Sequence, residues 1–475
     1  MPLLSIEFAL CFLIFLPIYW SLHRSPRWQN RALLAASLLY LCTVHWAVAL
    51  AVVWFALAIW QIAFKIQSSE HAKSRKMWLS GGIVLALANL GLFKYFDFFR
   101  PAFQAAFGDN VADWVMPLGI SYYTFQAIAY LLAIYRRENV GMIRGDLLLH
   151  FSFFPTITSG PIIRAGSLKS IYGTQMGFTE QVQTTQPRQM VRPALALALI
   201  ALGLAKKWWL SGMLAENWVN PVFENPLQYD ALSAWAAVLG YTFQLFLDFS
   251  GYTDLVLGMA MLLGFRLPEN FNMPLRAVNI RDFWERWHIT LSTWIRDYIY
   301  IPLGGSRQGF VRTQVNVMLA MLLSGIWHGY GWNFLLWGAL HGVAFVVVNS
   351  CERTLGKHYF QNRFGTWAAV GLTFLFVSVS FIIFRTHNLG ETGQMFTALL
   401  GGGQQAHMAW SALGMIALMV AVVAAYPKMN ALFQAAVLRL ERLPYWTWSF
   451  ILAAIMMILM AVAPSGIPGF IYANF

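Results

Sequence analysis

The sequence predicts an all-α polytopic membrane protein, and its composition carries that prediction. Hydrophobic residues fill 59% of the 475 positions, whereas charged residues fill only 11%. Soluble globular chains average roughly 45–50% apolar and 25% charged residues. Because one spanning helix needs about 20 mostly apolar residues, the chain has room for about ten to twelve transmembrane helices.

Apolar stretches, each a candidate helix or pair of helices, follow one another along the whole chain. They lie at residues 2–22, 32–64, 77–99, 114–135, 147–163, 193–213, 231–266, 313–350, 366–384, 408–426 and 446–466. The second stretch is long enough for two short spans with a turn near Thr43–His45. No polar stretch could form a separate soluble domain, so we expect one integral domain over residues 1–475. Its motif-rich core is expected at 90–350, and its C-terminal spans at 366–466.

The net charge of +12 comes from lysines and arginines in short loops between apolar stretches, such as 23–31 and 65–76. This is the positive-inside pattern, so it indicates orientation in a membrane and not a nucleic-acid partner. We expect these loops to face the cytoplasm. No CxxC or metal spacing occurs among the three cysteines, so neither a disulfide framework nor a cysteine zinc site is indicated.

Two of the apolar stretches contain features of broken helices. Residues 147–163 are short and are interrupted by Pro155 and Gly160–Pro161, so we expect a re-entrant segment inside protein or along a cavity. In 231–266, Asp248 and Asp254 flank residues typical of a turn between two short spans. Carboxylates at membrane depth need partners. The expected partners are the arginines that follow in the chain, Arg276, Arg281, Arg286 and Arg296.

Residues 280–298 have the pattern of one amphipathic helix. Apolar side chains recur at helical spacing at Ile280, Trp284, Trp287, Leu291, Trp294 and Tyr298. Polar side chains follow an adjacent stripe at Arg281, Glu285, His288, Ser292 and Arg296. We expect this helix at the membrane interface, or between spans with its polar stripe toward a water-filled hollow.

His328 is the most informative residue, because it lies between two apolar segments and among glycines. A titratable ring at membrane depth is a candidate functional group by default. One interpretation is a core histidine bonded to a neighbouring helix. The other is a general base or proton carrier, since burial favours the neutral, proton-accepting imidazole.

Two further histidines, His288 and His341, lie near His328 in the sequence. His288 could simply be solvated on its polar stripe, and His341 can cooperate with His328 only if the chain bends between them. A zinc site from the three is possible, but the HExxH spacing is absent. Ser324 precedes His328 by one helical turn, yet no GxSxG elbow supports a serine nucleophile.

Two nearby stretches resemble the signature of the membrane-bound O-acyltransferases. They are Pro268–Pro274 (PENFNMP) and Asp282–Gly305 (DFWERWHITLSTWIRDYIYIPLGG). The resemblance is to the bacterial branch that acetylates alginate or cellulose and D-alanylates teichoic acids, and it extends over about residues 1–390. Further matching segments are Phe93–Tyr95, Pro117–Tyr123, Ser159–Arg164 and Gln244–Tyr252.

This resemblance implies a ring of helices, with re-entrant segments and interfacial amphipathic helices, around a transmembrane tunnel. His328 matches the family's catalytic histidine, and His288 matches the position of a second polar catalytic residue. The tunnel and substrate contacts are expected at Trp327, Ser324, Asp297, Arg296, Trp287, Asn333 and His341. No bound cofactor or metal is expected.

The function implied is movement of acetyl groups from a cytoplasmic thioester, with acetyl-CoA as the expected donor, for O-acetylation of an exported polysaccharide such as alginate or cellulose. Periplasmic acetyltransferase proteins are the expected partners, and the bacterial inner (cytoplasmic) membrane is the expected location. The same machinery could transfer D-alanyl groups or acylate peptidoglycan. From the residues alone, a proton-coupled transporter or flippase and a structural subunit of an export complex also stay open.

Overall fold

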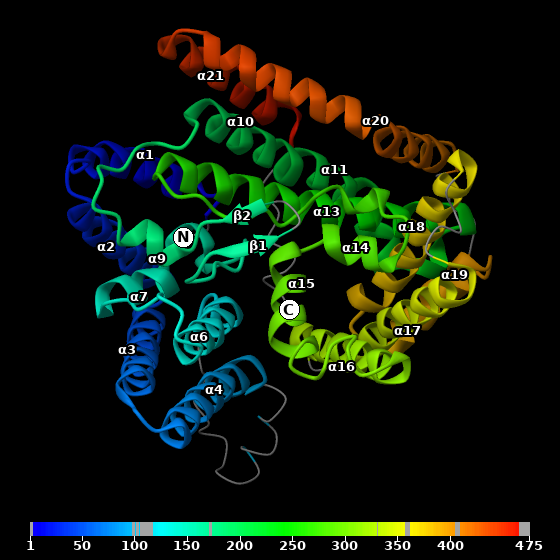
Figure 1. The fold of residues 1–475 in the computed structure, drawn as a ribbon. Coiled ribbons are helices and arrows are strands. Elements are labelled where there is room, and N and C mark those ends of the chain that lie inside the picture. The colour runs from blue at the N-terminus through cyan, green and yellow to red at the C-terminus, as the bar shows by residue number, and fades with distance from the viewer. Residues whose placement is uncertain are drawn as a thin grey trace. The chain divides into compact units, whose positions relative to one another are not determined.

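The computed structural model describes residues 3–96, 100, 104, 117–170, 173–329, 331–356, 362–403 and 409–464 (Figure 1). It is mostly helical, with one short antiparallel hairpin of β1 (Leu168–Ser170) and β2 (Gly173–Gln175), so the all-α prediction is confirmed. The chain groups into two compact units. The first comprises Met1–Ala196 and Val256–Pro268, and the second Leu197–Leu255 and Glu269–Phe475. Tyr330, which follows His328–Gly329, lies outside the described residues.

Nine helices in the described ranges have the length and apolar composition of a membrane span, so the chain is a multi-pass membrane protein. Nine is below the ten to twelve expected from the sequence. One reason is helix length, since an α-helix rises about 1.5 Å per residue. The apolar helix α1 (Ile6–Ser21) has 16 residues and is short for a span.

The first unit confirms a predicted turn and shows how the segment 147–163 is broken. Helix α2 ends at Val44 and α3 begins at Trp46, as expected for a turn near Thr43–His45. In 147–163 the chain forms α7 and the four-residue α8 in place of a span, and Pro155 stands in the first turn of α8. The helices of this unit are α1, α2 (Pro26–Val44), α3 (Trp46–Ser68), α4 (Ala72–Lys94), α6 (Ile120–Tyr135), α7 (Arg144–Ser152), α8 (Phe154–Ile157) and α9 (Phe178–Val182).

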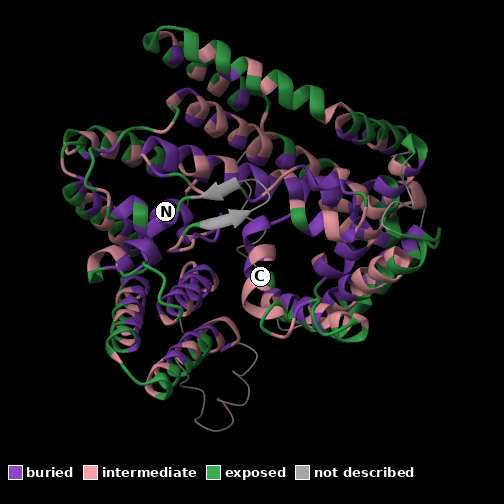
Figure 2. Cartoon of the chain, viewed as in Figure 1, coloured by how far each residue is buried: buried purple, intermediate pink, exposed green. Residues whose placement is uncertain are grey.

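The second unit contains the longer helices and all the candidate site residues. Figure 2 shows α13 as buried along most of its length, whereas α20 and α21 expose much of their surface. The α-helices, some of which also contribute residues to the first unit, are α10 (Pro193–Leu204), α11 (Gly212–Leu214), α12 (Asn220–Glu224), α13 (Ala231–Leu262), α14 (Ile280–Arg286), α15 (Ile289–Ile295), α16 (Phe310–His328), α17 (Trp332–Leu355), α18 (Arg363–Arg385), α19 (Leu389–Leu399), α20 (Ala409–Arg442) and α21 (Tyr445–Val462). Shorter π- and 3₁₀-helical pieces are η1 (Ala205–Ser211), η2 (Ala215–Val219), η3 (Pro226–Gln228), η4 (Pro274–Arg276) and η5 (Arg296–Tyr300).

The expected turn at Asp248–Asp254 is wrong, because α13 runs through it without a break. The expected arginine partners are wrong as well. Asp248 pairs with Lys207, and both side chains are 1% exposed. Asp254 pairs with Lys206 at 2.7 Å. Both lysines lie in the π-helix η1, a form in which the backbone bonds run from i to i+5 and which recurs at functional sites.

Two glycines allow the helices that carry these pairs to approach closely. A Cβ at Gly203 would lie 2.6 Å from the carbonyl oxygen of Gly251, and a Cβ at Gly251 would lie 2.8 Å from the carbonyl oxygen of Gly203. Small residues at helix crossings in membranes have this effect in general. The buried ion pairs therefore depend on a backbone contact that larger side chains would prevent.

The hairpin of α16 and α17 is packed in the same way. A Cβ at Gly325 would lie 2.3 Å from the Phe334 carbonyl oxygen, and one at Gly338 would lie 2.6 Å from the Met321 carbonyl oxygen. Gly338 and Gly342 form a GxxxG pair on α17. The glycines around His328 thus bring two helices together and hold the end of α16 in place.

We expect Gly338→Ala to reduce the thermal stability of the protein in detergent, because its added methyl group meets backbone that cannot rotate away. Gly371→Ala on α18 is the matched control, since a Cβ there meets nothing within 4 Å. Alanine favours a helix interior over glycine by about 1 kcal/mol, so the control should be neutral or stabilising. Equal melting temperatures for the two variants, measured by fluorescence-detected size exclusion, would contradict this account of the hairpin.

We also expect Lys207→Met to destabilise the protein strongly, because Asp248 is then buried without its cation. Breaking a buried ion pair on one side costs about 3–5 kcal/mol, whereas replacing both partners by apolar residues is often neutral. The double variant Lys207→Met/Asp248→Leu should therefore melt above the single variant. Lys206→Met is the control, since its pair is 21% and 17% exposed. If the double variant were less stable than Lys207→Met, the loss of the Lys207 cation beside Asp248 would not be the main cause of the instability. That result would contradict the view that the pair is shielded from solvent.

Candidate active site

The predicted amphipathic helix over 280–298 is broken at its centre, which is a correction to the sequence interpretation. Helix α14 ends at Arg286, α15 begins at Ile289, and the π-helix η5 follows. His288 stands at the break with φ 42° and ψ 53°, in the left-handed region. A residue other than glycine held there is uncommon, and such strain clusters at functional sites.

Asn270 explains why the break is stable. The backbone N–H of Ile289 donates to the Asn270 carbonyl oxygen at 3.0 Å. The Asn270 side-chain oxygen accepts from the N–H and the hydroxyl of Thr290 at 3.2 and 2.6 Å. The first backbone N–H groups of a helix have no partners within the helix. The bonds to Asn270 satisfy such donors at the start of α15. The segment Pro268–Pro274 therefore braces the backbone that carries His288.

His288 is buried in apolar surroundings. Its side chain is enclosed and its ring lies 4.8 Å from the Phe249 ring, centroid to centroid. Removal from water disfavours the charged imidazolium, so burial lowers the pKa of His288 to about 3. The imidazole is therefore neutral at physiological pH, and a neutral imidazole keeps one N–H donor and one acceptor nitrogen.

His328 is the last residue of α16 and is enclosed by three aromatic rings. The centroid distances are 4.6 Å to Trp327, 5.1 Å to Trp337 and 5.0 Å to Phe384, and all three contacts are edge-to-face. Aromatic pairs prefer this arrangement. The ring of the predicted base is thus held on several sides while only 3% of the residue is exposed.

The structure brings His288 and His328 to the same indole. Trp327 lies 6.3 Å from the His288 ring and 4.6 Å from the His328 ring, centroid to centroid. These two histidines are 40 residues apart in the sequence, one at the break between α14 and α15 and the other at the end of α16. Trp327 is thus a shared neighbour of the two predicted catalytic residues.

His341 lies deeper and is bonded through both ring nitrogens. Its Nδ1 accepts from the Trp284 indole N–H at 3.2 Å, and its Nε2 lies 3.0 Å from the Ser380 hydroxyl. Its ring packs 4.6 Å from Trp337, which also borders His328. In the described part of the chain, no group of three His, Cys, Asp or Glu side chains could hold a metal ion.

The other predicted tunnel residues lie in different surroundings. Trp287 is buried among aromatic rings, stacked 5.4 Å from Phe283. Asn333 donates to the Thr386 carbonyl oxygen at 2.6 Å. The Ser324 hydroxyl is buried and meets no hydrogen-bond partner among the described residues, so it forms no serine–histidine pair.

Arg296 and Asp297 lie on η5 and pair with each other at 2.8 Å. The Arg296 side chain is about half exposed, unlike the histidines. This pair belongs to the surface of the second unit and not to its aromatic interior.

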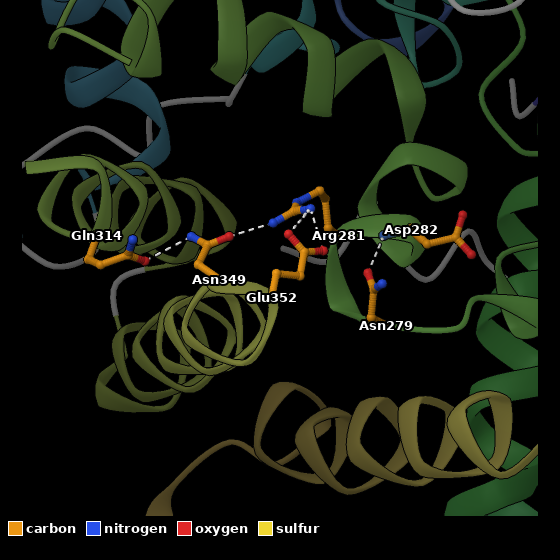
Figure 3. Close-up of polar contacts among 6 residues, drawn as sticks. All are labelled: Asn279, Arg281, Asp282, Gln314, Asn349 and Glu352. Carbon is orange, nitrogen blue, oxygen red and sulfur yellow. Dashed lines mark hydrogen bonds and ion pairs between the residues drawn. The ribbon is translucent and has the colours of Figure 1, made fainter. Parts of the chain in front are cut away.

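A polar latch, made of Arg281, Glu352, Asn349 and Gln314, ties α14 to α17 and α16 (Figure 3). One Arg281 nitrogen lies 2.8 and 2.9 Å from the two Glu352 oxygens, and the other contacts Asn349. Asn349 in turn donates to Gln314 at 2.8 Å. The latch shows what the arginines do in place of pairing with Asp248 and Asp254. Arg286 bonds Asp282, and Arg276 lies over Trp367.

Four residues that contact the candidate site were not predicted from the sequence: Asn270, Phe249, Phe384 and Ser380. Asn270 lies inside the resembling segment Pro268–Pro274, where nothing marks it out from its neighbours. Phe249 lies between the carboxylates Asp248 and Asp254, whose charge is the more conspicuous signal. Phe384 and Ser380 lie on α18 in an ordinary apolar run, where no local signal marks them.

Comparison with known proteins identifies the family of this chain. Residues 146–386 match the membrane-bound O-acyltransferase family. A protein of Pseudomonas syringae pv. tomato described as a probable alginate O-acetylase (AlgI) is 33% identical over 406 residues, which cover 82% of this chain and 74% of the relative. The peptidoglycan O-acetyltransferase of Helicobacter pylori is 32% identical over 368 residues, 72% of this chain and 68% of the relative.

The teichoic acid D-alanyltransferase of Bacillus subtilis is a more distant relative. It is 30% identical over 283 residues, which cover 56% of this chain and 68% of the relative. Membership of this family indicates acyl transfer. It favours neither the transporter nor the structural subunit that the residues alone left open. The chain belongs to the membrane-bound O-acyltransferase family and is an acyltransferase that crosses the membrane several times.

Proposed function

We propose that this acyltransferase moves an acetyl group from a cytoplasmic acetyl thioester, acetyl-CoA, for O-acetylation of an exported polysaccharide, with His328 as general base. The observation that carries the proposal is the buried pair of His288 and His328 around Trp327. A buried base and a second, neutral hydrogen-bonding ring are the groups that acyl transfer to a hydroxyl requires.

The chemistry needs little else from the protein. A thioester is already activated, so the enzyme must orient it, remove the hydroxyl proton and stabilise the developing oxyanion. His328 accepts the hydroxyl proton as the new C–O bond forms and the C–S bond breaks, and then returns that proton to the departing thiolate. His288, neutral because of its burial, donates a hydrogen bond to the oxyanion.

The choice of acetyl as the acyl group is supported by the relatives. The two O-acetylating proteins match more of this chain, at 82% and 72%, than the D-alanyltransferase, at 56%. A polysaccharide acceptor fits the name of the alginate O-acetylase relative. We extend the proposal to cellulose as an alternative acceptor and to periplasmic acetyltransferase partners that complete the transfer. D-alanyl transfer is the second candidate, and it differs in the donor thioester.

We propose that the substrate path runs past Trp327, Ser324, Asn333 and Trp287, and that Arg296 and Asp297 stand at its entrance. The burial of Ser324, Asn333 and Trp287 supports the inner set, to which the partly exposed Trp327 also belongs. The exposure of the Arg296 side chain supports the outer set. The buried Ser324 hydroxyl, one helical turn before His328, is available to a substrate hydroxyl that approaches the base.

His328→Ala should lower turnover of acetyl-CoA by about 10²–10⁴-fold, the usual contribution of a general base. The measurement is release of free CoA thiol by purified protein in nanodiscs with an oligosaccharide acceptor, together with the acetyl content of the exported polymer in cells. The variant should still insert and accumulate, and its level in the membrane fraction is measured alongside turnover.

His23→Ala is the control for that experiment, because His23 is exposed and bonds only its own helix end through the Trp20 carbonyl oxygen. It should turn over acetyl-CoA like the wild type. Wild-type turnover in His328→Ala would refute the assignment of the base. If the protein consumed a D-alanyl thioester in preference to acetyl-CoA, the proposed donor would be wrong. The assignment of His328 as the base would be unaffected.

His288→Asn should retain more activity than His288→Ala, because asparagine tolerates the left-handed backbone and can still donate a hydrogen bond. It should also leave the pH–rate profile between pH 5 and 8 unshifted. The pKa of His288 is lowered to about 3, so His288 does not change its protonation state between pH 5 and 8. An apparent pKa that moves in His288→Asn would show that His288 titrates during turnover.

A further inference from the structure

His341 has a defined hydrogen-bond direction on both sides of its ring. An indole N–H can only donate, so Nδ1 accepts from Trp284 and the ring proton must be on Nε2. Nε2–H then donates to the Ser380 hydroxyl, which itself donates to the Val377 carbonyl oxygen at 2.7 Å. The series of hydrogen bonds from Trp284 to Val377 is therefore complete, and each bond has one donated proton.

This arrangement leaves His341 no free nitrogen. A second proton would have to enter at Nδ1, where it would face the Trp284 N–H and break that bond. His341 is fully buried, so no solvent is at hand to replace the lost partner. The ring is thus built to stay in one neutral form, unlike a proton carrier.

The same ring joins three helices around the candidate site. His341 lies on α17, Trp284 on α14 and Ser380 on α18. Trp284 belongs to the short helix that ends two residues before His288. Trp337 packs on His341 at 4.6 Å with its ring tilted, and it meets His328 edge-to-face at 5.1 Å. Trp284 and Trp337 also pack on each other at 5.7 Å.

We infer that His341 is a positioning residue that sets the spacing of the two histidines of the site, in place of the tunnel role expected from the sequence. Through Trp284 it holds the helix that leads into the break at His288, and through Trp337 it supports the ring of His328. The inference rests on the proposed function, because it concerns the pair that carries out the transfer. The polar latch is a second attachment of α14 to α17, at Arg281 and Glu352.

The kinetic test replaces His341 by leucine, asparagine and glutamine. Leucine fills space without hydrogen bonds, whereas the amides keep one or both bonds but cannot carry a proton. His341→Leu should lower kcat by about 10- to 100-fold, since small misplacements of reacting groups have effects of that size, with the acetyl-CoA KM unchanged. At least one amide variant should recover most of the loss. Amide variants as inactive as His341→Leu would overturn the inference in favour of a proton carrier.

Trp284→Phe probes the same interaction from its other side, because it removes the N–H that reaches His341 while it keeps an aromatic ring in a smaller side chain. Its effect on kcat should not add to that of His341→Leu, since the two changes break one interaction. Additive losses would show that Trp284 and His341 act separately. Unchanged kcat in His341→Leu would overturn the inference directly.

A spectroscopic readout separates this inference from the proposed function. In protein labelled with ¹⁵N-histidine, the signal lost in His341→Gln should show an Nε2–H tautomer that does not titrate from pH 5 to 8. A titrating His341 with turnover that depends on His328 would overturn the positioning role alone. A fixed tautomer, together with turnover that does not depend on His328, would overturn the proposed base and with it the kinetic role of His341.

Discussion

Burying a polar side chain in the apolar interior of this protein is costly unless the side chain finds a partner, and much of the second unit follows from that constraint. An unpaired polar group away from water costs several kcal/mol, and an unpaired charge costs more. Lys207 finds Asp248, and Asn333 finds the backbone of Thr386. His341 uses both nitrogens. Each of these contacts joins two helices, so satisfying a polar group also fixes how the helices are arranged.

Such contacts need helices that approach closely, and glycine supplies the space. Where Gly203 meets Gly251, and where Gly338 meets the backbone of α16, a methyl group would collide with main chain. In lipid, helices are not driven together by the hydrophobic effect, so packing and interhelical hydrogen bonds carry the association. The glycines around His328 are thus explained by the hairpin that presents this residue.

The sequence predicted the parts of the fold that depend on local pattern. Apolar runs marked most of the helices, and the polar residues near His45 marked the turn between α2 and α3. It missed what depends on distant partners. The break at His288 is braced by Asn270, eighteen residues earlier, while the helical spacing of apolar residues continues across the break. Lys207 reaches across 41 residues to Asp248, and no local pattern distinguishes that lysine from the arginines that were expected.

For the candidate site, the sequence identified both histidines but not what surrounds them. A histidine at membrane depth is conspicuous because it is costly, whereas an aromatic residue in an apolar run is ordinary. Phe249, Trp337 and Phe384 therefore gave no signal, although they form the walls against which the two imidazoles rest. The neighbours of a catalytic group come from several helices, so they are known only once the helices are assembled.

The aromatic walls also bear on how an acyltransferase avoids becoming a hydrolase. In the proposed reaction, a thioester beside a base would react with whichever hydroxyl reaches that base, and water is the most abundant one. Rings packed at 4.6–5.1 Å around His328 leave the residue 3% exposed, which limits the access of bulk water to the proposed base. Burial among apolar groups also keeps His288 uncharged. Apolar surroundings thus account for the protonation state of His288 and for the selectivity proposed for His328.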